Sequence, residues 1–170
     1  ANSASRSYVS FGDFSRGTLL ETKYSVNDFY ASRDETFVSI GDGNQATDRH
    51  FFGQIKTDNS SSPKGVVSWN MHIDKIWAYN ATSWATGKGI TNIEWYPAQA
   101  DAKCSGDVTL ASGKVVSFND APCYQDRNWG RSFPSWWSWI VSNHFENSPD
   151  TVVAIGGGKP NYFGVPFPYS

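Results

Sequence analysis

Apolar and polar residues alternate along several stretches of this chain, and the clearest case covers residues 65–75. One set of alternate positions there is apolar: Val67, Trp69, Met71 and Ile73. The positions between them are polar: Ser68, Asn70, His72 and Asp74. Because successive side chains of a strand point to opposite faces, the stretch predicts a β-strand with one side against a core.

Shorter stretches with alternating or β-branched residues predict further strands. They cover residues 18–31, 35–40, 50–56, 91–96, 107–110, 114–118, 135–145 and 151–155, and the first 16 residues leave room for a short edge strand. Residues 18–31 also fit a helix, but their β-branched and aromatic content favours a strand.

Turn residues separate these strands. Residues 41–44 and 111–113 are expected to be hairpin turns, and residues 57–64 a solvated loop. The first turn lacks the spacing and terminal Glu of an EF-hand. We expect Pro97 to end a strand, residues 98–106 to form a loop, and the proline-rich residues 156–170 to lie outside any central strand.

No stretch shows a convincing helical period, so about eight strands predict one all-β domain, a barrel or a sandwich, over residues 1–170. An antiparallel barrel is favoured, since aromatic strand faces need an enclosed interior.

Residues 116–145 carry the densest set of candidate site residues. We expect a polar elbow over residues 119–130, followed by a strand over residues 135–145. Alternation then places Trp137, Trp139, Val141, Asn143 and Phe145 on one face. The opposite face holds Trp136, Ser138, Ile140, Ser142 and His144. Large rings sharing a face with one amide are suited to an apolar pocket with one orienting polar group.

The elbow holds Asp120, Tyr124, Asp126, Arg127, Asn128 and Trp129, and ends at Gly130. A polar loop before a barrel strand is a suitable place for a site. The alternative is that the Asp, Asn and Arg side chains only satisfy loop backbone groups.

A family resemblance rests on the order of residues here: Phe118, Asp120-Ala121-Pro122, Tyr124, Asn128-Trp129-Gly130, Phe133-Pro134, Trp137, Trp139, Asn143 and Phe145, with Gly156-Gly157-Gly158 after the next strand. This order resembles the central signature of the tocopherol cyclase family. That family is related to carotenoid hydratase-like and fungal Diels-Alderase-like proteins, which are built from two lipocalin-like barrels. The resemblance implies a lipocalin-like barrel here, with a second barrel or further chain segment elsewhere, since family members are longer.

The resemblance also implies roles for the site residues. Trp137, Trp139 and Asn143 are expected to line a ligand cavity, with Phe145 on the same face and Asn143 donating a hydrogen bond to a substrate oxygen. Four elbow residues are expected to shape the mouth of this cavity: Asp120, Tyr124, Asn128 and Trp129. Asn143, Asp120 and Tyr124 are the catalytic candidates, and His144 is expected to face away. The alternative is that both Trp residues belong to the core.

A second candidate for chemistry is the pair His72 and Asp74, because residues i and i+2 of a strand share a face. The alternative, which we favour, is a polar row facing solvent.

Metal and cofactor motifs are missing from the sequence. The histidines at positions 50, 72 and 144 share no short ligand spacing, and neither a dinucleotide fingerprint nor a nucleophile elbow is present. The formal net charge is −2, with 18% charged residues and no basic stripe, so nucleic acid is not an expected partner. The expected partner is a hydrophobic small-molecule substrate, handled without cofactor.

Signals of a secretory route are present. Cys104 and Cys123 flank the strand at 114–118 at a spacing that one disulfide could close, and Asn59 and Asn80 begin glycosylation sequons. Together they favour a secreted or extracellular glycoprotein. The sequence shows no signal peptide or membrane span, and its start is compatible with removal of a leader.

Three functions remain open from the sequence. The first is a cofactor-independent cyclase, of the Diels-Alderase or hetero-Diels-Alderase type, that folds an apolar polyketide or terpenoid in secondary-metabolite biosynthesis. A proton-initiated cyclase or hydratase is a variant of it, in which a buried Asp120 protonates an alkene or helps a hydroxyl leave. The second is a non-catalytic carrier of hydrophobic ligands, and the third is a carbohydrate-binding β-sandwich with exposed Trp rings.

Overall fold

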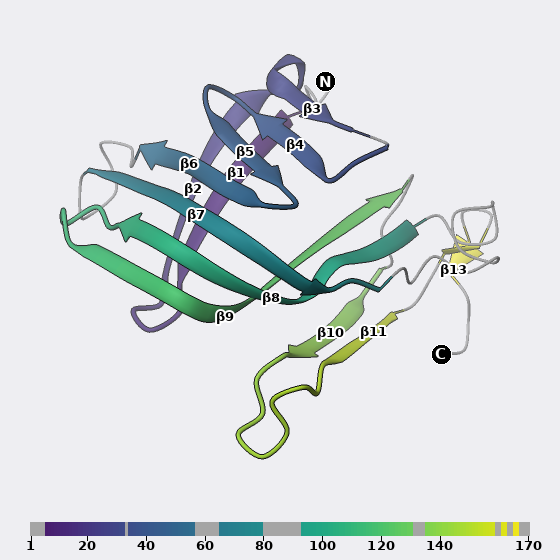
Figure 1. The fold of residues 1–170 in the computed structure, drawn as a ribbon. Helices are drawn as coiled ribbons and strands as arrows, with labels where there is room; N and C mark the ends of the chain where they lie inside the picture. The colour runs from purple at the N-terminus through teal and green to yellow at the C-terminus, as the bar shows by residue number, and fades with distance from the viewer. Residues whose placement is uncertain are drawn as a thin grey trace. The chain divides into compact units, whose positions relative to one another are not determined.

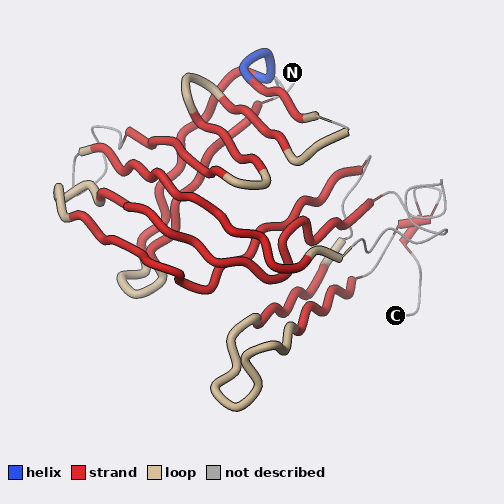
Figure 2. Tube along the Cα trace, in the orientation of Figure 1, coloured by secondary structure: helices blue, strands red, loops and turns tan. Residues whose placement is uncertain are grey.

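The protein is all-β (Figures 1 and 2). Its computed structural model describes residues 6–32, 34–56, 65–79, 93–130, 135–158, 161–162 and 165–166. Within these ranges the only helical element is a single turn of 3-10 helix, η1 (Val26–Asp28). No helix among the described residues is long and apolar enough to cross a membrane. The prediction of an all-β protein is confirmed.

Thirteen strands are assigned in the described residues. They are β1 (Arg6–Asp13), β2 (Thr18–Ser25), β3 (Phe29–Ala31), β4 (Phe37–Ile40), β5 (Asn44–Thr47), β6 (His50–Lys56), β7 (Val66–Trp77), β8 (Ile93–Thr109), β9 (Val115–Gly130), β10 (Trp137–Ser142), β11 (Val153–Gly158), β12 (Asn161–Tyr162) and β13 (Val165–Pro166).

Seven of these strands form one sheet in simple chain order, from β3 to β9. The pairs β1–β2, β10–β11 and β12–β13 form separate two-stranded sheets. Every strand pair whose register is resolved is antiparallel. The seven-stranded sheet begins at β3 and ends at β9, so no closed barrel is present among the described strands, and the lipocalin-like barrel stays a prediction.

The chain divides into two compact units. The first comprises residues 1–74 and 104–121, and the second comprises residues 75–103 and 122–170. Strands β7, β8 and β9 contribute residues to both units.

The core of the first unit is built by β6 and β7. Ile55, Val67 and Trp69 are buried together. Val9, Phe11 and Leu20 of the β1–β2 ribbon pack against them, as do Val108 and Ala111. The alternation along β7 follows the sequence pattern, with Val67, Trp69, Met71 and Ile73 all buried. His72 and Asp74 lie on the exposed face, where His72 Nε2 is 3.2 Å from Asp74 Oδ1, as expected for a solvent-facing row.

The chain reverses at both predicted hairpin turns, but the first turn joins β4 to β5, a strand that the sequence did not predict. Gly41 and Gly43 adopt positive φ angles between β4 and β5, which glycine tolerates without strain. Leu110 N–H donates to Lys114 O over 2.8 Å and closes the hairpin between β8 and β9.

The predicted loop at residues 98–106 was wrong, because β8 continues through Pro97 to Thr109. Ala98, Ala100, Ala102 and Cys104 are buried at alternate positions of this strand. Proline adopts extended backbone angles, so it can occur within a strand at a position where no backbone N–H is needed to pair with the neighbouring strand. The period of two was present in the sequence, but it was carried by alanines, whose low strand propensity concealed it.

The polar elbow at residues 119–130 was also wrong, since β9 runs without interruption from Val115 to Gly130. A local kink occurs at Asp120, which has φ +50°. The strand predicted at residues 114–118, before the elbow, was correctly placed. The polar side chains after it do not prevent a strand, because the neighbouring strand β8 pairs with the backbone of β9. The predicted buried strand at residues 151–155 is β11, which extends to Gly158 and exposes Ile155.

Several predictions fall outside the described residues. They concern the sequons at Asn59 and Asn80, the solvated loop at residues 57–64, and Phe133 and Pro134 of the signature.

Candidate functional site

The candidate site lies in the second unit, where three strands bring aromatic rings around one carboxylate. Trp95 Nε1 donates to Asp126 Oδ2 over 2.7 Å, and the Tyr124 hydroxyl donates to the same oxygen over 3.2 Å. Trp95 comes from β8, and Tyr124 and Asp126 come from β9. Tyr124 and Asp126 are two residues apart on one strand, which puts both side chains on one face.

Burial raises the pKa of Tyr124 to about 12, and the neighbouring Asp126 carboxylate adds to this effect. Both causes disfavour the phenolate, since burial penalises charge and the carboxylate repels a second negative charge. Tyr124 therefore stays protonated at neutral pH and acts as a hydrogen-bond donor.

Trp139 of β10 packs on this cluster. Its ring centroid lies 5.5 Å from that of Tyr124, with the ring planes at 52°. Across the β10–β11 ribbon, Trp139 is paired with Gly156 and Trp137 with Gly158. The two large rings thus stand opposite residues without side chains, which explains the glycines of the signature.

A Cβ atom at Gly156 would approach the Trp95 ring to 3.4 Å, and one at Gly158 would come within 2.8 Å of the Trp136 carbonyl oxygen. A side chain at Gly158 would therefore clash with the β10 backbone, whereas one at Gly156 would make only ordinary contact with Trp95, and Gly157 has no atom within 4 Å.

The opposite face of β9 carries Arg127 and Trp129. The Arg127 guanidinium carbon lies 6.0 Å from the Tyr96 ring centroid and 5.7 Å from that of Trp129, both within the range of cation–π attraction. Trp129 was predicted to lie at a pocket mouth, and in the structure it contacts the Arg127 guanidinium, as Tyr96 does.

Asn143 follows β10 and is half-buried. Its Nδ2 donates to the Cys123 carbonyl oxygen over 2.6 Å. An amide nitrogen carries two hydrogens, so a second N–H remains in addition to this bond. Both cysteines of the chain are disulfide-bonded, which confirms the predicted bridge between Cys104 and Cys123.

The remaining predicted residues are exposed. The exposed fraction is 64% for Trp137 and 44% for Trp139, and Asn128, Phe145 and His144 are exposed as well. Asp120 is an exposed residue of the first unit, and its backbone N–H donates to Ser105 Oγ over 3.1 Å. The cavity lining by Trp137, Trp139 and Asn143 stays a prediction.

Two members of the cluster were missed as site residues. Asp126 was assigned to an elbow, and Trp95 to a separate strand. The spacing of Tyr124 and Asp126 was the available signal, and the elbow assignment concealed it. The bond from Trp95 joins residues that are 31 positions apart, which a local pattern does not reveal.

The cluster contains one carboxylate. Among the residues that the structure describes, no group of three or more His, Cys, Asp or Glu side chains could hold a metal ion.

Comparison with known proteins places the chain in a family. A model of tocopherol cyclase-like proteins matches residues 4–166. A probable chloroplastic tocopherol cyclase of Oryza sativa subsp. japonica is 32% identical over 104 residues, which is 61% of this chain and 22% of the relative. A chloroplastic tocopherol cyclase of Zea mays is 26% identical over 86 residues, or 51% of this chain and 18% of the relative. The chain thus spans about a fifth of the length of these relatives, and no solved structure matches it.

Proposed function

This chain belongs to the tocopherol cyclase-like family, and on that premise we propose that it acts as a cyclase on an apolar polyketide or terpenoid substrate. The observation that carries the proposal is the family match over residues 4–166. The cluster of Trp95, Tyr124, Asp126 and Trp139 supports it, because the Asp126 carboxylate accepts from Trp95 and Tyr124 and so holds their rings in place as aromatic surface.

The proposed mechanism is positioning without cofactor. Trp139 and Trp137 supply exposed aromatic surface for an apolar chain, and a ligand covering them removes that surface from water. Holding a flexible substrate in its reactive conformer can contribute several kcal/mol to the lowering of the barrier. The second N–H of Asn143 would then donate to a carbonyl or quinone oxygen where charge develops, whereas the single hydrogen of the Tyr124 hydroxyl is already donated to Asp126.

Tyr124 is unsuited to start a ring closure by protonating the substrate. A phenol whose pKa is about 12 is a poor proton donor at neutral pH, whereas it remains a hydrogen-bond donor. A cycloaddition of the Diels-Alder or hetero-Diels-Alder type needs no net proton transfer. Proton-initiated cyclisation or hydration is the alternative chemistry, and it would need an acid other than Tyr124.

The test of the proposed site is a set of single variants. Asn143→Ala and Trp139→Phe are each expected to reduce turnover about tenfold, equivalent to about 1.4 kcal/mol each. His144→Ala is the matched control, because this neighbour of Asn143 is exposed and outside the cluster. Circular dichroism must show all three variants folded. If His144→Ala abolished activity while Asn143→Ala had no effect, the site assignment would be wrong.

The rival function is a carrier of hydrophobic small molecules. On this hypothesis, the exposed rings of Trp137 and Trp139 would bind apolar ligands without a reaction following. Quenching of tryptophan fluorescence by a polyene, with the polyene recovered unchanged, favours the carrier. A carbohydrate-binding role for the same rings predicts quenching by oligosaccharides instead.

We also propose that the protein passes through the secretory pathway. The disulfide supports this location, because disulfides persist in oxidising compartments. A glycosidase-sensitive increase in mass at Asn59 or Asn80 of the native protein is the expected result, and reduced thiols with no glycan would contradict it.

A further inference from the structure

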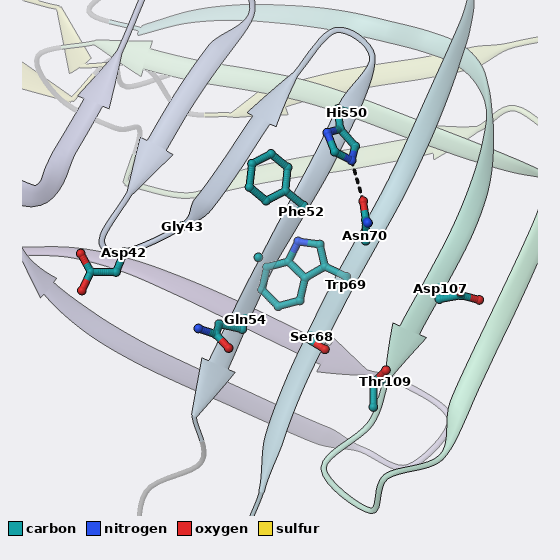
Figure 3. Close-up of a pocket in the computed structure, with 11 residues that line it drawn as sticks. Asp42, Gly43, His50, Phe52, Gln54, Ser68, Trp69, Asn70, Asp107 and Thr109 are labelled. Carbon is teal, nitrogen blue, oxygen red and sulfur yellow. Dashed lines mark hydrogen bonds between the residues drawn. The ribbon is translucent and has the colours of Figure 1, made fainter.

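The first unit contains a cavity of about 430 Å³ that is largely open to solvent and that none of the predicted site residues lines (Figure 3). Its volume is typical of small-molecule sites, which span roughly 300–1,000 Å³. The lining residues are Asp42, Gly43, His50, Phe52, Gly53, Gln54, Ser68, Trp69, Asn70, Asp107 and Thr109.

Three neighbouring strands build this cavity, mostly from one sheet face. In the register of β6 and β7, Phe52 is opposite Asn70, and Gln54 is opposite Ser68. Asp107 and Thr109 come from β8, the next strand of the sheet. These positions are two residues apart along each strand, so their side chains share a face.

Gly53 and Trp69 shape the cavity from the buried side of the sheet. A Cβ atom at Gly53 would lie 2.6 Å from Trp69 Cζ2, so the indole ring lies directly against the glycine. Trp69, whose exposed fraction is only 6%, also lines the cavity. Because the ring is fixed in the core, this wall of the cavity is rigid.

Only some of the polar groups in the cavity are engaged with other residues. His50 Nε2 donates to Asn70 Oδ1 over 2.5 Å, which leaves the Asn70 amide nitrogen without a partner among the described residues. Asp107 accepts from Ser117 over 2.6 Å. Within the described part of the chain, the side chains of Asp42, Gln54, Ser68 and Thr109 make no hydrogen bond or ion pair.

The unpartnered groups combine donors and acceptors. A carboxylate only accepts, whereas amides and hydroxyls do both. No Lys or Arg lines the cavity, which argues against an anion, and the side chain of Phe52 adds an apolar surface. A ligand with several hydroxyl groups and an apolar ring face would complement all of these features.

We infer that this cavity is a binding site for a neutral polyhydroxylated ligand, a sugar ring of a free or protein-linked glycan. Gln54 and Asn70 would bind adjacent hydroxyl groups across the β6–β7 pair. Asp42 would accept from a third hydroxyl, and the ring of Phe52 would contact the C–H face of the sugar. The site uses residues of the first unit alone, so a test of sugar binding can succeed or fail whether or not the protein is a cyclase.

Isothermal titration of the full chain with maltose, cellobiose, diacetylchitobiose and mannobiose tests this site. At least one disaccharide is expected to bind, and Gln54→Ala and Asn70→Ala are each expected to weaken that binding about tenfold. Gln45→Ala is the matched control, since Gln45 lies on β5 outside the lining and should leave affinity unchanged.

Two further probes, choline and inorganic phosphate, separate the sugar from charged ligands. Binding of a disaccharide by the wild type and the Gln45→Ala variant, with loss in the two lining variants, supports the site. The inference is overturned if no disaccharide binds at about 10 mM, a concentration that detects dissociation constants in the millimolar range. It is equally overturned if the lining variants bind a sugar normally, or if choline or phosphate binds there instead.

Discussion

Replacing Tyr124 with phenylalanine removes one hydroxyl from the cluster while its ring can remain against Trp139. That hydroxyl donates to Asp126 Oδ2 over 3.2 Å, and burial raises the pKa of Tyr124 from 10.0 to about 12. The folded protein therefore holds this proton more tightly than the unfolded chain does. By linkage, the stabilising contribution is fully present below pH 10 and is lost as the pH rises through about 12.

The size of this contribution follows from the shift. Two pKa units correspond to about 2.7 kcal/mol of differential interaction. Tyr124 is only partly buried, so screening by water reduces this to about 1 kcal/mol. We expect Tyr124→Phe to lower the free energy of unfolding by about 1 kcal/mol near neutral pH. The difference from wild type should shrink as the pH rises from about 10 to about 12.

The assay is urea unfolding, followed by circular dichroism at steps of pH from neutral to strongly alkaline. Tyr8→Phe is the matched control, because Tyr8 is an exposed tyrosine of β1. Wild type and Tyr8→Phe should lose stability together above pH 10, while Tyr124→Phe should lose less. A constant gap between wild type and Tyr124→Phe across this range would refute the reasoning.

Three other variants test the fold. Gly106→Ala should cost about 3 kcal/mol of unfolding free energy, because the new Cβ would overlap the Asn70 carbonyl oxygen at a backbone φ of +141°. Gly113→Ala, which also has a positive φ but no atom within 4 Å, should cost about 1 kcal/mol, and equal urea midpoints for the two variants would contradict this account. Replacing Cys104 and Cys123 together with serine should cost about 3 kcal/mol. A wild-type urea midpoint that does not change on addition of reductant would contradict that expectation.

The sequence predicted strands well where large apolar residues carried the pattern. Along β7, Val67, Trp69 and Met71 alternate with polar residues, and each faces the core as expected. The pattern failed along β8, where Ala98 and Ala100 carry the same period. Alanine buries little surface, so its alternation is a weak signal of burial, and Pro97 was taken as the end of a strand.

The candidate site was predicted in part. Tyr124 and Trp139 were both predicted from the family signature, and the structure brings their rings together. Asp126 was not selected, because an elbow assignment removes the alternation that puts it beside Tyr124. Trp95 could not be paired with Asp126 from local sequence, since that contact depends on how β8 and β9 align.

The central claim is that this chain directs a ring closure, and the stereochemistry of the product tests it most directly. A polyene or quinone-methide precursor of cycloaddition is incubated with and without the native protein, and the products are separated by chiral chromatography. We predict a faster reaction with the protein and one dominant stereoisomer in place of the mixture formed spontaneously. The same rate and the same mixture of isomers with and without protein would contradict the claim.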